Sequence, residues 1–173
     1  MGAGTPIVAL IDRIREKPFL VVSTREIIGM VAWSDLQKLP VRAALFALVT
    51  GFELTMYKAI RSHFGKHDHW TDLLKDDRLR KAKTKYRERC DRDSEVDLLL
   101  CTQFCDKRDI IIKSFDFAIG RKKLKKKLKT IERVRDDVAH VNNYAMSFAQ
   151  AQQLGCTLGH LRELRSQIHS FAC

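Results

Sequence analysis

The sequence predicts a mainly α-helical protein, an antiparallel helix bundle preceded by a short α/β segment. From residue 39 onward, apolar residues recur every three or four positions, which is the spacing of a buried helix face. Glycines such as Gly65 and Gly120 break these periodic stretches, and short connections favour antiparallel neighbours. Before residue 39, two apolar β-branched runs flank a turn, as in a hairpin. We therefore expect an α/β segment over residues 1–38 and a helical bundle over residues 39–173.

The α/β segment has the order helix, strand, turn, strand, helix. PIVALIDRIREK (6–17) predicts a short helix closed by Pro18, and FLVVS (19–23) and IIGMVAW (27–33) predict two strands. Asp35, with Ser34 before it, can cap the helix that follows. Two strands alone are marginally stable, so this segment is expected to pair with a second copy, with missing sequence or with the second half of the chain.

Four or five helices are expected in the bundle, each from its apolar spacing and its breaks. The first begins near Pro40, ends at Gly65 and buries Leu45, Leu48, Val49, Phe52, Met56 and Ile60. A charged helix follows, capped by Thr71 and running through Tyr86, and the next runs from Leu98 to Phe115 after a capping box at Ser94–Asp97. A long helix is expected from Arg121 to Phe148. After a break at Leu154-Gly155, a last helix runs from Leu158 to Phe171.

The charge of the chain favours a polyanionic partner. The formal net charge is +11, and residues 61–140 alone carry 23 basic and 15 acidic side chains. Such a concentrated basic surface is typical of proteins that bind nucleic acid, with anionic lipid as the second possibility. No apolar run reaches about 18 residues, so no membrane span is expected. The N-terminus lacks the features of a signal peptide, and the five cysteines form no disulfide framework, which indicates a cytoplasmic protein.

Two clusters could be interpreted as metal ligands, but neither is complete. Cys101 and Cys105 are four residues apart without a second pair, and His63, His67 and His69 with Asp68 fit an ordinary polar loop. We expect neither a metal nor a cofactor.

The segment RKKLKKKLK (121–129) is the most basic stretch, with seven basic residues in nine positions. Its leucines begin an apolar stripe that faces the core and comprises Leu124, Leu128, Ile131, Val134, Val138 and Val141. The lysines between them face outward and would attract a phosphate backbone by counterion release, without reading base sequence. The expected RNA-binding residues here are Lys122, Lys123, Lys125, Lys126, Lys127 and Lys129. A merely solvated face and a membrane surface are the alternatives.

The same helix carries the segment IERVRDDVAHVNNY (131–144), in which an arginine precedes a histidine by five positions. At 100° per residue, Asp136 and Arg133 share a face with His140, on the side away from the apolar stripe, whereas Arg135 is turned about 140° from His140. We therefore expect the imidazole to face solvent or a partner. Arg135 and His140 can meet through a kink, or across a two-fold axis between two copies.

These residue types suit attack by an RNA 2′-hydroxyl on its own phosphate. Histidine transfers protons near neutral pH, and arginine clamps phosphate oxygens. Asp136 could orient the imidazole, while Asn142, Asn143 and Arg133 could contact the substrate phosphates. This reaction requires no metal.

The pattern resembles the HEPN family over about residues 39–171. HEPN domains are helical bundles whose late helix carries arginine, a polar residue, three further residues and then histidine, here Arg135, Asp136 and His140. Many members are metal-independent ribonucleases whose two motifs meet at a dimer interface, and others are non-catalytic binding modules. The resemblance implies that Arg135 and His140 are catalytic, that Asp136 supports them and that the chain forms a homodimer.

The N-terminal segment resembles the later part of a CBS module. FLVVSTREIIGMVAWSDL reproduces its strand, turn and strand, followed by a glycine and an aspartate six apart, Gly29 and Asp35. In that family the aspartate commonly holds the ribose of an adenine nucleotide, so the resemblance implies a nucleotide contact at Asp35. A degenerate structural or dimerising role is the alternative.

The sequence thus supports one leading hypothesis and two others. The first is a metal-independent, dimeric endoribonuclease that uses Arg135 and His140. The second is a non-catalytic nucleic-acid-binding module. The third is a dimeric ligand sensor that uses the N-terminal segment.

Overall fold

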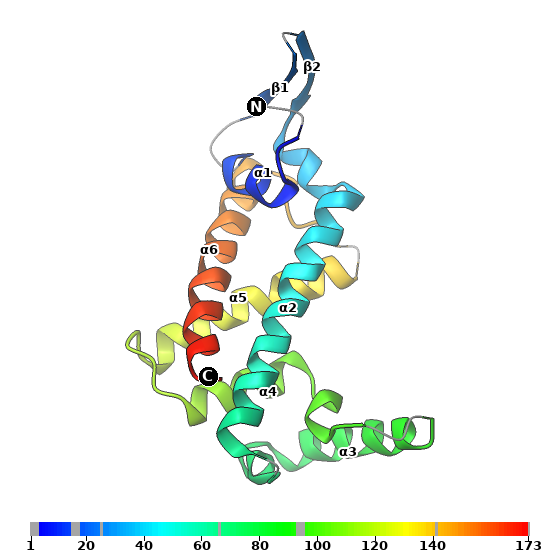
Figure 1. Ribbon diagram of the computed structural model, residues 1–173, viewed down its shortest axis with the longest axis vertical. Helices are drawn as coiled ribbons and strands as arrows, with labels where there is room; N and C mark the ends of the chain where they lie inside the picture. The colour runs from blue at the N-terminus through cyan, green and yellow to red at the C-terminus, as the bar shows by residue number, and fades with distance from the viewer. Residues whose placement is uncertain are drawn as a thin grey trace. The chain divides into compact units, whose positions relative to one another are not determined.

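A computed structural model describes residues 4–14, 18–24, 26–65, 67–92, 96–140 and 142–172. Its described part is mainly helical and contains one small antiparallel sheet (Figure 1), which confirms the coarse fold class predicted from the sequence. The elements in chain order are α1 (Ile7–Ile14), β1 (Phe19–Ser23), β2 (Glu26–Val31), the 3₁₀ turn η1 (Trp33–Gln37), α2 (Leu39–Phe64), η2 (His69–Leu73), α3 (Asp76–Cys90), η3 (Leu98–Cys101), α4 (Phe104–Ser114), α5 (Arg121–Ala139) and α6 (Phe148–Ser170).

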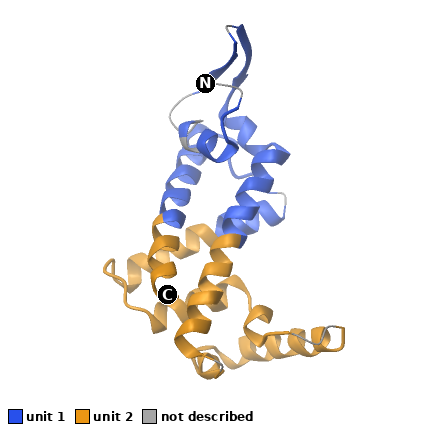
Figure 2. Ribbon diagram, viewed as in Figure 1, with its two compact units in different colours: residues 1–50, 133–162 blue, residues 51–132, 163–173 orange. Residues whose placement is uncertain are grey.

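The chain divides into two compact units (Figure 2). Unit 1 comprises residues 1–50 and 133–162, and unit 2 comprises residues 51–132 and 163–173. The helices α2, α5 and α6 each contribute residues to both units. The boundary predicted between residues 38 and 39 stays a prediction.

The hairpin of unit 1 confirms the two predicted strands. β1 and β2 are antiparallel, with Phe19 opposite Val31, and a β-bulge interrupts the register after Val21, which lies opposite Gly29. Thr24 in the turn has a positive φ of 54°. The hairpin leaves five apolar side chains largely exposed, namely Leu20, Val22, Ile27, Ile28 and Met30. The expectation that this segment pairs with a second copy, with missing sequence or with the second half of the chain stays a prediction.

Each unit has a core built from the predicted apolar stripes. In unit 1 the buried side chains include Ile11, Leu36, Leu45, Val49, Val134, Val138, Leu154 and Leu158. In unit 2 they include Phe52, Met56, Ile60, Trp70, Leu99, Phe104, Ile110, Leu124, Leu128, Ile131 and Ile168. The expected faces of α2 and α5 are therefore confirmed, apart from Leu48, which is half-buried, and Val141, which lies outside the described residues.

Helix α2 is long and apolar enough to cross a membrane by length and composition. This is weak evidence, because the core helix of a soluble protein passes the same test. In unit 2, Phe52 and Met56 are fully buried, and Glu53 forms a 3.0 Å ion pair with the buried ammonium of Lys107. These contacts place the middle of α2 in the core of unit 2, and the expectation that no helix spans a membrane stays a prediction. A cytoplasmic location stays a prediction.

The prediction of one long helix over residues 121–148 is wrong at its C-terminal end. α5 ends at Ala139, and His140 lies in the turn that follows. The backbone N–H of Asn142 donates to the carbonyl of Asp137, five residues back, at 2.9 Å. A hydrogen bond that spans five residues instead of four is typical of a helix C-terminus, where the last carbonyls need donors from outside the helix.

The break predicted at Leu154-Gly155 is also wrong, because α6 continues without interruption from Phe148 to Ser170. A glycine inside a helix costs only about 1 kcal/mol. Leu154, Leu158 and Leu161 are almost completely buried and offset that cost through packing in unit 1.

Two other helices begin later than predicted. The stretch from Leu98 to Phe115 divides into η3 and α4, because Asp106 accepts a hydrogen bond from the Gln103 N–H at 2.8 Å and starts a new helix. Thr71 lies inside η2 and does not cap the charged helix, which starts at Asp76 as α3. The predicted capping box falls partly outside the described residues, but Asp97 caps η3 through the Leu99 N–H at 2.9 Å.

Candidate nucleic-acid interface

The C-terminal end of α5 is fixed by an arginine from α2. The guanidinium of Arg42 donates to the carbonyl oxygens of Asp137 at 3.2 Å, Val138 at 3.3 Å and Asn142 at 3.1 Å. A cation at a helix C-terminus is favourable because the exposed carbonyls carry partial negative charge. The turn that contains His140 is therefore held from outside the helix.

Arg42 is itself positioned by a buried tyrosine. Its guanidinium carbon lies 5.0 Å from the centroid of the Tyr144 ring, a cation–π distance. The Tyr144 hydroxyl donates to the carbonyl of Leu36 at 2.6 Å, and burial raises its pKa. Residues 36, 42 and 144 thus clamp the turn after α5 within unit 1.

His140 is exposed, as its position away from the apolar stripe predicts. Its backbone N–H donates to the carbonyl of Asp136 at 2.9 Å, which places the imidazole one residue after the end of α5. The guanidinium of Arg135 forms a 3.0 Å ion pair with the adjacent Asp136. Within the described part of the chain, no hydrogen bond or ion pair joins Arg135 to His140. One copy of the chain therefore brings Arg135 to Asp136 but does not bring the two proposed catalytic groups together.

The three polar residues expected to assist the pair lie around the same turn. Asn142 and Asn143 are exposed, and the Asn142 amide nitrogen donates to the Asp137 carboxylate at 3.3 Å. Arg133 is also exposed, and its Nε lies 4.0 Å from the same carboxylate. Asp137, which was not among the residues predicted for the site, is the acceptor that Asn142 and Arg133 share.

The first half of α5 presents its basic residues to solvent, as predicted. Lys122, Lys123, Lys125, Lys126 and Lys129 are exposed, and Leu124 and Leu128 are buried beneath them. Lys127 differs, because it is half-buried and forms a 2.6 Å ion pair with Glu163 of α6 within unit 2. It is therefore less available to a phosphate than its neighbours.

A second basic helix was missed by the sequence analysis. α3 has seven arginines and lysines among its fifteen residues. Six of them are exposed, namely Arg80, Lys81, Lys83, Lys85, Arg87 and Arg89. The signal was present in the sequence, since the segment RLRKAKTKYRER is almost as basic as RKKLKKKLK.

The expected nucleotide contact, Asp35, has hydrogen-bond partners within η1. Its carboxylate accepts from the Ala32 N–H at 2.8 Å and pairs with Lys38 at 2.7 Å. Burial alone would raise the pKa of Asp35, but Lys38 and the Ala32 N–H stabilise the carboxylate and lower the pKa overall. The adenine-nucleotide site stays a prediction.

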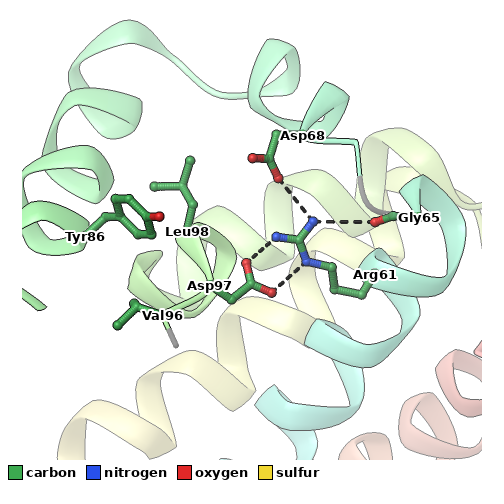
Figure 3. A pocket seen from close by; sticks show the side chains of 7 residues that line it. All are labelled: Arg61, Gly65, Asp68, Tyr86, Val96, Asp97 and Leu98. Atoms are coloured by element: carbon green, nitrogen blue, oxygen red, sulfur yellow. Dashed lines mark hydrogen bonds and ion pairs between the residues drawn. The ribbon is translucent and has the colours of Figure 1, made fainter. Parts of the chain in front are cut away.

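A cleft of about 480 Å³ in unit 2 surrounds Arg61 (Figure 3). Arg61 lies between two carboxylates. Its Nε donates to Asp97 at 2.7 Å and its Nη1 lies 3.1 Å from Asp68. Tyr57 also donates to Asp97 at 2.7 Å. Burial alone would raise the pKa of Asp97, whereas these donors lower it overall. One guanidinium faces two carboxylates here, so these ion pairs stabilise unit 2 and the residues that line the cleft offer no unpaired cation.

The remaining metal candidates do not gather into a site within the described ranges, where no group of three histidine, cysteine or acidic side chains is close enough to hold an ion. Asp68 of the histidine-rich loop instead accepts a hydrogen bond from the indole of Trp70 at 3.0 Å.

No protein-family model matches the sequence, and neither a curated protein nor a solved structure shows significant similarity to it.

Proposed function

We propose that this chain is a metal-independent endoribonuclease of the HEPN type, which acts as a homodimer through Arg135 and His140. The observation that supports this most is the exposed His140, held by Arg42 at the end of a helix whose first half carries seven basic residues. The basic residues can attract a polyanion, and an imidazole can transfer protons at neutral pH, and metal-free RNA cleavage uses both properties.

In the proposed reaction, His140 removes the proton of an RNA 2′-hydroxyl. The 2′-oxygen attacks the adjacent phosphorus, the bond from phosphorus to the 5′-oxygen breaks, and the leaving oxygen takes a proton. The products are a 2′,3′-cyclic phosphate and a 5′-hydroxyl. Arg135 donates to the phosphate oxygens as negative charge develops on them.

The geometry of one chain supports the proposed dimer. Arg135 is paired with Asp136 and not with His140, so a single copy lacks a complete site. A two-fold axis near this turn would place Arg135 of one copy beside His140 of the partner subunit, and the reverse contact would form at the same time. Within each such site, the imidazolium that forms when His140 takes the 2′-proton can return that proton to the leaving 5′-oxygen, so one His140 and one Arg135 complete the site.

The test is cleavage of total RNA by the purified chain in excess chelator. The proposal predicts fragments with 2′,3′-cyclic phosphate ends, detected because they resist 3′-ligation until the cyclic phosphate is opened and removed. Cleavage that stops with the chelator, or products with 3′-hydroxyl ends, would contradict it.

A non-catalytic RNA-binding module is the second candidate, and the Arg135–Asp136 ion pair favours it. A guanidinium already neutralised by a carboxylate is a weaker phosphate ligand, because the substrate must displace the carboxylate. Under this candidate the chain binds RNA through the basic half of α5, and replacement of His140 changes nothing.

A further inference from the structure

A second cleft in unit 2 differs from the Arg61 cleft in its charge. It has a volume of about 520 Å³ and is bordered by the start of α3, by α4 and by the first half of α5. The basic side chains that line it are Lys75, Arg78, Arg108, Lys113 and Lys125. The carboxylates that line it are Asp77, Asp106 and Asp109.

Two of the five cations have structural partners. Arg78 donates to both oxygens of Asp106, at 2.7 and 3.0 Å, and Arg108 pairs with Asp109 at 2.8 Å and with Glu132. Because these pairs are partly buried and held by more than one bond, they stabilise the packing of α3, α4 and α5 in unit 2.

The other three cations have no such carboxylate. Among the described residues, Lys75, Lys113 and Lys125 form no ion pair, although the Lys113 ammonium donates to the Leu73 carbonyl at 2.5 Å. Asp77 is the remaining acidic side chain of the cleft. The cleft therefore holds three ammonium groups against one carboxylate, which is an arrangement that attracts phosphate.

The exposed face of α3 extends this positive charge beyond the cleft. Lys81, Lys85 and Arg89 follow each other at intervals of four residues, and like charges at this spacing destabilise a helix. Packing contributes little compensation, because Ala82 is the buried residue of α3. A bound polyanion would remove the repulsion, so α3 has the charge pattern of a nucleic-acid-binding helix.

We infer that RNA bound along the first half of α5 continues through this cleft onto α3, so that unit 2 contacts the phosphate backbone with two helices. Lys125 joins the two surfaces, because it belongs to the exposed face of α5 and also lines the cleft. Lys75 and Lys113 then contact phosphates inside the cleft, and Lys81 and Lys85 contact phosphates along α3. This inference rests on the proposed RNA binding and adds the path of the RNA.

The test is a salt titration of binding to 2′-O-methyl RNA, which lacks the attacking hydroxyl and cannot be cleaved. The log of the affinity falls with the log of the salt concentration, and each lost phosphate contact makes this slope shallower by about 0.7 for single strands. Lys75→Gln/Lys113→Gln is therefore expected to make it shallower by about 1.4. Lys81→Gln/Lys85→Gln is expected to lower it by the same amount. This second variant leaves the Lys113–Leu73 bond intact, so a folding defect from Lys113 does not decide the result.

The matched control is Lys58→Gln/Arg165→Gln, which removes two exposed charges of unit 2 outside α3, α5 and the cleft. The inference predicts a slope close to that of the parent for this control. Slopes equal to the parent in both test variants, or an equal fall in the control, would overturn it.

If the α3 and cleft variants behave like the parent while variants in the first half of α5 weaken binding, only the inferred path fails. If the parent does not bind the RNA at all, the proposed function fails as well.

Discussion

The two halves of α5 differ in charge and in how firmly their side chains are held. Residues 121–129 carry seven basic residues, no acidic residue and mostly exposed side chains. Residues 133–139 carry two arginines and two aspartates, His140 follows in the next turn, and Arg42 holds this end through backbone carbonyls. In the proposed function, the first half attracts RNA and the second half orients the reacting groups. Affinity and chemistry should therefore separate by mutation.

The largest expected effect is on the second half. His140→Ala should lower cleavage at least about a hundredfold, because it removes the proposed acid–base group. Affinity for 2′-O-methyl RNA should stay within about twofold, since the substitution removes no lysine or arginine. The measurement is the initial cleavage rate, with His67→Ala as the control for an exposed histidine elsewhere. If His140→Ala lowered the RNA affinity as much as it lowered the cleavage rate, the two halves of α5 would not be separable.

The next effect is on the first half. Replacing Lys122, Lys123, Lys126 and Lys129 by glutamine should lower the salt slope of RNA binding by about 2.8, while cleavage at saturating RNA stays close to that of the parent. Neighbouring single variants sharpen the comparison. Lys126→Gln should lower the slope by about 0.7, and Lys127→Gln by less, because Lys127 is already paired with Glu163. An identical effect at both positions would contradict this assignment.

A smaller effect is expected at Arg42, which positions the turn and does not touch RNA in the proposal. Arg42→Ala removes bonds to the carbonyls of residues 137, 138 and 142 and should lower the free energy of unfolding by about 2 kcal/mol. Cleavage should fall while RNA affinity stays unchanged, and Arg42→Lys should restore part of both losses. Chemical denaturation measures the stability, with exposed Arg13→Ala as the control. Stability equal to that of the parent would show that the turn is held by other contacts.

The sequence was sufficient for the features that depend on local periodicity. The apolar spacing of α2 and α5 predicted their buried faces, and the two β-branched runs predicted the hairpin. The exposure of His140 followed from the same helical geometry.

The features that were missed depend on contacts between distant residues. At the end of α5, Arg42 donates to the carbonyls of Asp137 and Val138 from 95 positions before Asp137, and no local pattern contains that contact. α6 continues through Gly155 because its leucines are buried in unit 1, which a local reading of glycine does not predict. The basic residues of α3 were visible in the sequence, but the cleft that brings Lys125 close to the start of α3 arises only from folding.

The most direct test of the proposed site mixes two inactive variants, Arg135→Ala and His140→Ala. If each site combines Arg135 of one copy with His140 of the partner subunit, a mixed dimer regains one of its two sites, and an equal mixture should recover about a quarter of the parent rate. No recovery, with both variants folded and dimeric, would contradict a site shared between two copies.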